Sequence, residues 1–176
     1  MDFIDKLENM HACKGACEWV GGKSLSEAWE TCERGDWMLW LAVAVGVDRK
    51  KVVLAACECA RLSLRYIPEG ETRPLKAIQV AEAWVNGNAS LEEVEQAGDA
   101  AYAVSVSAAY AAYAVVDAAG DASYAAASAS SASSAYAASY ASDSAWKSTM
   151  KQCADIVRKR ILVEDIEEAN EYLCIG

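Results

Sequence analysis

Residues 123–142, "SYAAASASSASSAYAASYAS", contain only alanine, serine and tyrosine. Alanine is the strongest helix former, and serine costs only a few tenths of a kcal/mol per helical residue. A disordered linker would be rich in glycine, proline and charge, which this stretch lacks. The stretch therefore predicts helix, and its small side chains would let neighbouring helices approach closely.

The same composition continues on both sides of this stretch. Tyr102, Tyr113 and Tyr124 are spaced by 11 residues, about three helical turns. They would lie along one face of a single helix, or on equivalent faces of two helices if Gly120 turns the chain. We expect a pair of closely packed, Ala/Ser/Tyr-rich helices at the centre of the domain. An ice-binding helix or a low-complexity segment is less favoured, because threonine is scarce and helix caps flank the region.

The rest of the chain also predicts helices. It has only two prolines, and no segment shows the alternation of a strand. Ser24 with Glu27 and Ser90 with Glu93 form capping boxes, and Asp48 is a further N-cap. The expected helices cover 2–20 (with a possible break near Gly15), 25–32, 37–45, 49–66, 74–87, 91–116, 146–161 and 163–173. The sequence thus predicts an all-α single-domain bundle of about six to eight helices over 1–176, with a Trp-rich half (1–88) and an Ala/Tyr-rich half (89–176).

Charge and composition restrict the class of protein. The 16 Lys and Arg against 26 Asp and Glu give a net charge of −10, which disfavours nucleic-acid binding. The uncharged run 38–45 is too short for a membrane span, and the acidic N-terminus is unlike a signal peptide. Seven cysteines, an odd number, indicate reduced thiols rather than disulfides. We expect a soluble cytoplasmic protein.

Motifs for catalysis are weak. His11 is the only histidine, and no G-x-S-x-G or glycine-rich phosphate loop occurs. The pairs Cys13/Cys17 and Cys57/Cys59 lack the spacing of a zinc site, so buried structural thiols are the simpler interpretation. We therefore expect no enzymatic activity, no metal and no cofactor.

The segment "CERGDWMLWLA", 32–42, is the most distinctive block. Trp37 and Trp40 are three residues apart and share a helix face. Together with Trp29 and Trp84 they could build the core, or form an aromatic pocket or interface anchor. The tripeptide Arg34-Gly35-Asp36 is interpreted as helix C-cap, turn and N-cap rather than as an adhesion motif.

Basic residues suggest a second candidate site. Arg65 and Arg73 flank the one clear loop, and Arg73 precedes Pro74 at a helix N-terminus, where free amides favour an anion. The residues could equally be solvated charges on helix faces. An anion pocket walled by tryptophan and tyrosine could accept a nucleotide-like ligand.

The segments 27–42, 73–87 and 152–161 resemble the Imm-5-like immunity proteins, small helical proteins of bacteria and their phages. The resemblance covers about residues 10–165 and implies an inhibitory protein that binds a toxin or a defence component. Its motif positions in this chain are Arg34, Asp36, Trp37, Trp40, Arg73, Pro74, Trp84, Gln152, Asp155 and Arg158. All of these except Pro74 and Gln152 are our candidate binding residues. The chain departs from the family in being rich in cysteine and serine.

Three functions remain open on the sequence. The first is a non-enzymatic inhibitor that neutralises a protein partner, with acids such as Glu92, Glu93 and Glu95 steering association. The alternative is a phage counter-defence protein that sequesters a small anionic, nucleotide-like signal through Arg73 and Trp37. The third is a helical homo-oligomer that associates through its Ala/Tyr-rich face.

Overall fold

The computed structural model describes residues 2–62, 64–66, 69–102 and 143–173. All of its regular secondary structure within these ranges is helical, which confirms the all-α prediction. The α-helices are α1 (Phe3–Asn9), α2 (Lys14–Val20), α3 (Leu25–Thr31), α4 (Gly35–Ala44), α5 (Arg49–Arg61), α6 (Arg73–Val85), α7 (Leu91–Tyr102), α10 (Asp143–Arg160) and α11 (Val163–Leu173), with a 3-10 turn at Leu64–Tyr66. The helices expected at the centre of the domain from residues 103–142 lie outside the described residues.

The segment 2–20, for which a break near Gly15 was possible, is two helices, α1 and α2, and the break lies at residues 10–13, just before Gly15. The amides of His11 and Ala12 donate to the carbonyls of Glu8 and Leu7, at 2.9 Å each. His11 has a φ of 60°, which is outside the right-handed helical region. This pattern is a Schellman motif, in which histidine occupies the position that usually holds glycine. With this break the described residues contain nine α-helices, close to the expected six to eight.

The predicted N-caps are present. The Ser24 hydroxyl accepts from the amide of Glu27 at 3.2 Å, and the Asp48 carboxylate accepts from Lys50 at 3.1 Å. Ser90 and Glu93 form a complete capping box: the Ser90 amide donates to the Glu93 carboxylate at 2.7 Å, and the Glu93 amide donates to Ser90 Oγ at 3.2 Å. These contacts fix where α3, α5 and α7 begin.

The predicted cap of α4 is wrong. Arg34, not Asp36, is the N-cap residue, and Gly35 is already the first helical residue. A β-carbon on Gly35 would lie 2.4 Å from Cys153 Cβ and 2.8 Å from the backbone nitrogen of Ala154. Gly35 therefore allows the first turn of α4 to lie directly against α10.

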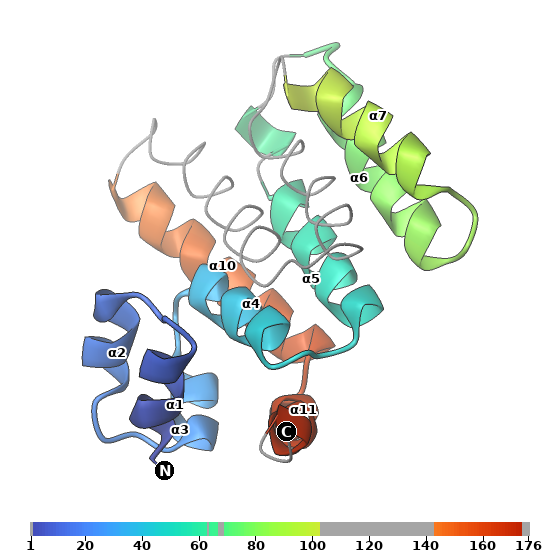
Figure 1. Cartoon of the computed structure of the whole chain (residues 1–176). Coiled ribbons are helices and arrows are strands. Elements are labelled where there is room, and N and C mark those ends of the chain that lie inside the picture. Colours follow the sequence, from blue (N-terminus) through green and yellow to red (C-terminus); the bar gives the residue numbers. More distant parts are fainter. Residues whose placement is uncertain (1, 63, 67–68, 103–142, 174–176) are drawn as a thin grey trace.

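Helix α5 is at the centre of the described fold (Figure 1). It packs against α4 and α10 on one side and against α6 on the other, while α7 packs along α6. The α6–α7 pair lies at one end of the molecule and α1–α3 at the other. Because α5 lies between these helices, it contributes to two buried clusters. Val52, Ala55 and Cys59 belong to the first, and Val53, Cys57 and Ala60 belong to the second.

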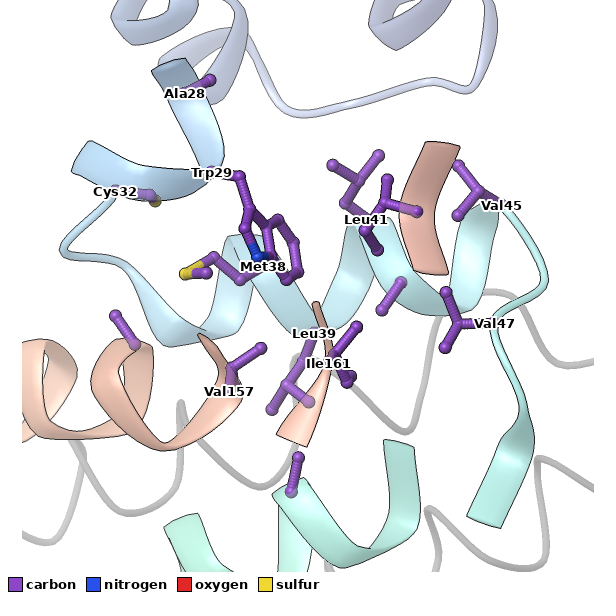
Figure 2. Packing of buried hydrophobic residues seen from close by; sticks show 14 of the residues in the cluster. Ala28, Trp29, Cys32, Met38, Leu39, Leu41, Val45, Val47, Val157 and Ile161 are labelled. Atoms are coloured by element: carbon purple, nitrogen blue, oxygen red, sulfur yellow. The ribbon is translucent and has the colours of Figure 1, made fainter. Parts of the chain in front are cut away.

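The larger core joins α4 and α10 to the N-terminal helices (Figure 2). Met150, Ala154 and Val157 of α10 are buried, as is Ile161 directly after the helix, which agrees with their helical spacing. Trp29 from α3 extends towards Met38 and Leu41 of α4. The core thus holds α3 and α4 in fixed positions around a group of tryptophans.

Candidate functional site

Helices α1–α4 surround a small hollow, which we call the aromatic cavity, with a volume of about 40 Å³. Five of its lining residues are half-buried, and we call them the mouth of the cavity: Phe3, Trp19, Leu25, Trp37 and Trp40. Its buried residues form the walls and floor: Leu7, Ala16, Val20, Ala28, Trp29, Cys32, Met38 and Leu41. The lining is apolar apart from the indole nitrogens and the sulfur atoms.

Two cations lie over the tryptophans at the mouth. The rings of Trp19 and Trp37 are 6.1 Å apart between centroids and inclined at 56°. Lys23 Nζ lies 4.3 Å from the centre of the Trp19 ring, and Arg34 Cζ lies 4.3 Å from the centre of the Trp37 ring. These cation–π contacts hold the two indoles in place.

Arg34 is in turn held by Asp36. Its Nε donates to Asp36 Oδ1 at 2.8 Å, and its Nη2 pairs with Oδ2. Burial alone would lower the pKa of Arg34, but the hydrogen bonds and charge of Asp36 outweigh burial and raise it. Arg34 and Asp36 therefore form a neutral pair that positions Trp37, and Arg34 is not a free anion-binding group.

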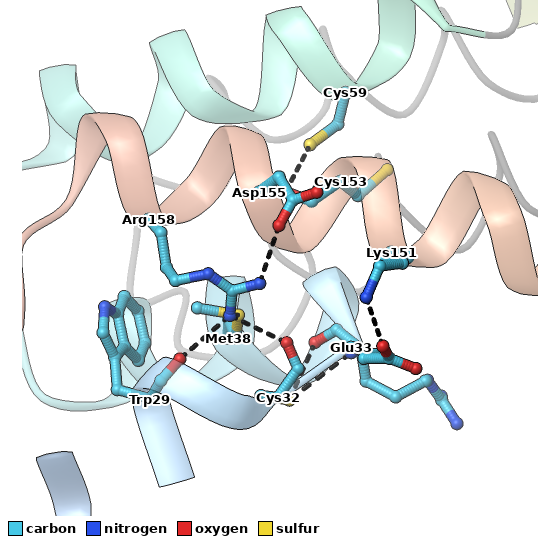
Figure 3. A network of polar contacts seen from close by, with 10 residues as sticks. Trp29, Cys32, Glu33, Met38, Cys59, Lys151, Cys153, Asp155 and Arg158 are labelled. Atoms are coloured by element: carbon cyan, nitrogen blue, oxygen red, sulfur yellow. Dashed lines mark hydrogen bonds and ion pairs between the residues drawn. The ribbon is translucent and has the colours of Figure 1, made fainter. Parts of the chain in front are cut away.

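Arg158 and Asp155 have a structural role in this arrangement (Figure 3). From α10, Arg158 Nη1 donates to the carbonyls of Trp29 at 3.0 Å and Cys32 at 2.8 Å, and Nη2 donates to Asp155 at 2.9 Å. The carbonyls lie at the C-terminal end of α3, where a helix lacks internal donors and favours a cation. Arg158 thus fixes α3, and with it Trp29, on α10.

The remaining candidates do not converge with this group. Arg73 and Trp84 are on α6, at the other end of the molecule (Figure 1), and Trp84 packs against the second core. Glu71 accepts from Arg73 Nε at 2.9 Å, from Nη2 at 2.6 Å and from the Arg73 amide at 3.0 Å. These bonds lower the pKa of Glu71 to about 2. The anion position expected at the start of α6 is therefore already filled by Glu71.

Trp29 has an unusual feature at the floor of the cavity. The residue is only 4% exposed, and its Nε1 is the one buried side-chain nitrogen or oxygen among the described residues without a hydrogen-bond partner. Nearly all buried polar groups in folded proteins are paired. The indole N–H of Trp29 is therefore an unpaired donor buried in the core.

A broader hollow, of about 590 Å³, lies between α1 and α2. Its charged residues, Glu8, Lys14 and Glu18, and its histidine, His11, are exposed to solvent, and Lys14 pairs with Glu18 at 3.4 Å. Among the described residues, no group of three or more His, Cys, Asp or Glu is placed to hold a metal ion. Every described helix is also too short or too polar to cross a bilayer.

The described cysteines are free thiols, and all except Cys13 are buried. Burial raises the pKa of Cys32, and it raises the pKa of Cys57 to about 12. Thiolates are the reactive form of cysteine, so these side chains behave as small core residues.

No family model matches the chain, and comparisons with curated proteins and with solved structures find no match. The site is therefore defined by its geometry. Of the candidates from the sequence, Arg34, Asp36, Trp37 and Trp40 come together at the cavity, Asp155 and Arg158 support it from α10, and Arg73 and Trp84 lie elsewhere.

Sequence reasoning missed Trp19 and Lys23, which lie at the mouth, and did not include Trp29 among the binding residues. One signal was available: four of the six tryptophans fall within residues 19–40. Because they belong to three separate short helices, helical spacing alone could not show that they meet.

Proposed function

We propose that the chain is a non-enzymatic inhibitory protein of the immunity type, which neutralises a protein partner by binding it through the face around the aromatic cavity. The observation that carries the proposal is this cavity, with three half-buried tryptophans at its mouth. Tryptophan, tyrosine and arginine dominate the energetics of protein interfaces, and anchors of this kind fill or surround small pockets.

The size of the cavity supports a protein partner over a small molecule. Ligand pockets that hold whole metabolites have volumes of roughly 300–1,000 Å³, whereas this one has about 40 Å³. It has room for the tip of one side chain. A nucleotide-like signal would in addition need free cations, and the guanidinium of Arg34 at the mouth is paired with Asp36.

The charge around the cavity supports a basic partner. Residues 1–37 carry eight acidic against four basic side chains, a formal net charge of −4. Glu27 and Glu30 on α3 are exposed, and α11, which packs against α3, adds exposed Glu164, Glu167 and Glu168. Acidic side chains near a binding surface attract a basic protein and accelerate its association. The reduced thiols fit a cytoplasmic protein, which is where we expect this partner to be met.

The alternative, sequestration of a nucleotide-like signal through Arg73, has weaker support. Glu71 already uses both the guanidinium and the backbone amide of Arg73. An incoming phosphate would have to displace a carboxylate that makes three hydrogen bonds.

Co-purification with matched tryptophan variants tests the proposal. Trp40→Ala removes a half-buried indole from the mouth of the cavity, while Trp84→Ala removes a half-buried indole from α6. After both variants are shown to be folded, the partner should be recovered with wild type and Trp84→Ala but not with Trp40→Ala. The purified partner should lose its activity when one equivalent of the chain is added.

Charge reversal gives a second comparison that leaves the core intact. Glu27→Lys with Glu30→Lys should slow association about threefold to tenfold at low salt and much less at high salt. Glu92→Lys with Glu95→Lys on α7, at the other end of the molecule (Figure 1), is the control. Glu93 is unsuitable because it caps α7. Equal effects of the two reversals would contradict the proposed face.

A further inference from the structure

The turn between α6 and α7 contains the dipeptide Asn86–Gly87. Asparagine before glycine is the pair that deamidates most readily in a flexible chain, because glycine has no side chain to hinder the reaction. Asn86, Gly87 and the following Asn88 are all exposed, so water reaches them. The turn thus carries a reactive pair at the surface, and its backbone geometry determines whether the pair can react.

Deamidation is an attack of one amide on another within the chain. The Gly87 backbone nitrogen loses its proton and bonds to Asn86 Cγ, while the bond from Cγ to Nδ2 breaks and ammonia leaves. Water then opens the resulting five-membered imide at either carbonyl and gives aspartate or isoaspartate. The net reaction consumes one water and releases one ammonia. It requires a Gly87 nitrogen that is free and close to Asn86 Cγ.

The C-terminal cap of α6 prevents this approach. Gly87 has a φ of 75°, and its amide donates to the carbonyl of Trp84 at 2.9 Å. The amide of Asn88 donates to the carbonyl of Ala83 at 2.8 Å, which completes a Schellman motif. Asn86 has a ψ of 1°, so the Gly87 nitrogen eclipses the backbone nitrogen of Asn86 and is rotated away from its side chain. The attacking nitrogen is therefore both hydrogen-bonded and misplaced.

The side-chain amide of Asn86 is held as well. Its Nδ2 donates to the carbonyl of Glu82, one turn back in α6, at 2.9 Å. Ring closure needs rotation of the Asn86 backbone, which breaks the bonds that Gly87 and Asn88 make to α6. Local openings of this kind occur in folded proteins without global unfolding. The reaction is therefore limited to molecules in which the turn has opened.

The acidic product does not fit the closed turn. A carboxylate in place of the Asn86 amide loses the donor to Glu82 and adds a negative charge at the C-terminal end of α6, which the helix dipole disfavours. Isoaspartate also lengthens the backbone before Gly87, which displaces the cap bonds. Helix α7 packs along α6 through buried Val94, so an open turn loosens α7.

We propose that Asn86 is a deamidation site that the cap of α6 protects: it reacts with water only when the α6–α7 turn opens, and the product then prevents the turn from closing fully. The modification is an irreversible record of opening at this end of the molecule. It is independent of the proposed function, because α6 and α7 lie at the opposite end from the N-terminal helices that form the aromatic cavity (Figure 1).

Peptide mass mapping of the full chain, incubated for days at neutral pH, measures the reaction. The signal is the small mass gain when the side-chain amide becomes a carboxyl group. We expect Asn86 to be modified at least about tenfold more slowly in the folded chain than in concentrated guanidinium chloride. Asn88, which precedes alanine in the same turn, is the internal reference and should react slowly in both conditions.

Two matched valine variants separate opening of the turn from unfolding of the whole chain. Val94→Ala removes a side chain that packs α7 on α6, and Val157→Ala removes one from the larger core; both valines are 0% exposed. We expect Val94→Ala to accelerate the modification of Asn86 about threefold or more, and Val157→Ala to change it less than about twofold.

Asn86→Asp tests the effect of one product directly. Asn88→Asp is the control, because it places the same charge in the same turn but beyond the end of α6. We expect Asn86→Asp to lower the thermal unfolding midpoint by about 2–4 °C and Asn88→Asp to lower it by less than about 1 °C.

Four results would overturn the inference. Equal rates in the folded and denatured chains would show that the cap does not protect Asn86, and no modification in either would show that it is not a deamidation site. Equal acceleration by Val94→Ala and Val157→Ala would assign the reaction to global unfolding. A wild-type midpoint for Asn86→Asp would show that the product fits the closed turn. If Val94→Ala does not fold, the other two comparisons still decide.

Discussion

At the scale of single residues, Gly35 and Arg158 set the position of the cavity. Gly35 allows α4 to touch α10, where a β-carbon would overlap Cys153 and Ala154. Arg158 ties the end of α3 to α10 through two carbonyl oxygens. The two contacts hold both α3 and α4 against α10. Helix α3 carries Trp29, and α4 carries Trp37 and Trp40.

Replacement of Gly35 by alanine should destabilise the protein. The methyl group would meet backbone atoms of α10 at 2.8 Å, which can move only if the helices separate. We expect Gly35→Ala to lower the free energy of unfolding by about 2–3 kcal/mol, measured by denaturant unfolding. Gly22→Ala is the control, because nothing lies within 4 Å of its added carbon. A loss of less than 0.5 kcal/mol, or the same loss for both variants, would show that the helices are not in close contact here.

Arg158 should be more important for stability than for partner contact. Arg158→Ala leaves the carbonyls of Trp29 and Cys32 without donors, and we expect a cost of about 2–3 kcal/mol. Arg158→Lys should recover less than half of it, because an ammonium cannot reproduce the planar arrangement of donors. Thermal unfolding of the three proteins measures this. If Arg158→Ala is as stable as wild type but does not bind the partner, Arg158 is a binding residue and the structural role is wrong.

The sequence identified these residue types but not all of their roles. The Arg34 to Trp40 block was recognised as distinctive, and four of its residues do meet at the cavity. The partners of Arg158 and Arg73 could not be predicted, because a side chain of that length reaches many acceptors and only packing selects one. The absence of a hydrogen-bond acceptor for Trp29 Nε1 could not be predicted either, because it depends on how the helices pack.

At the scale of elements, local signals predicted helix starts well and helix ends less well. The caps at Ser24, Asp48 and Ser90 depend on residues two or three positions away, so they can be recognised in the sequence. The end of α1 could not, because His11 takes the left-handed conformation without being glycine or asparagine. The start of α4 was misplaced by two residues because contact with α10 determines it.

Helix α11 should be sensitive to acid. Lys51 Nζ on α5 donates to Asp165 Oδ1 at 2.5 Å, and the Leu162 amide donates to Oδ2 at 2.9 Å. Burial opposes the charged form of Asp165, but these donors outweigh it and lower its pKa. Because the pKa is lower in the folded state, the stabilisation is complete above the unfolded pKa near 4 and is lost as the pH falls through the folded value.

We therefore expect Asp165→Asn to destabilise the protein by up to about 1 kcal/mol at pH 7 and to reduce the loss of stability as the pH falls below roughly 4. Denaturant unfolding at a series of pH values measures both effects. Glu95→Gln, an exposed residue of α7, is the control. An unchanged pH profile in Asp165→Asn would show that the Lys51 contact does not hold α11.

At the scale of the whole molecule, the thiols report on how tightly the core is closed. Cys57, Cys59 and Cys153 are 0% exposed, and burial raises the pKa of Cys57 to about 12. We expect iodoacetamide to modify exposed Cys13 first at neutral pH and to reach these three only when the protein opens. Peptide mass mapping at increasing times measures the order. Equal rates for Cys13 and Cys57 would contradict a closed core.

The fold class was predictable because caps, composition and helical spacing agree along most of the chain. The convergence of the candidate site was not, because it depends on how four short helices pack. The resemblance placed Arg73 and Trp84 in one list of motif positions with the α4 residues, whereas the structure places α6 at the other end of the molecule (Figure 1). Of the eight candidate residues, the structure thus places four at the aromatic cavity and two, on α10, in contacts that support it.

The most direct test of a protein-binding face is the native mass of the chain recovered from its own cells, compared with its denatured mass. We predict a protein-sized adduct that is present with wild type and Trp84→Ala and absent with folded Trp40→Ala. An adduct of a few hundred daltons that survives Trp40→Ala and disappears with Arg73→Ala would contradict the proposal and identify α6 as the binding site of a small anionic ligand.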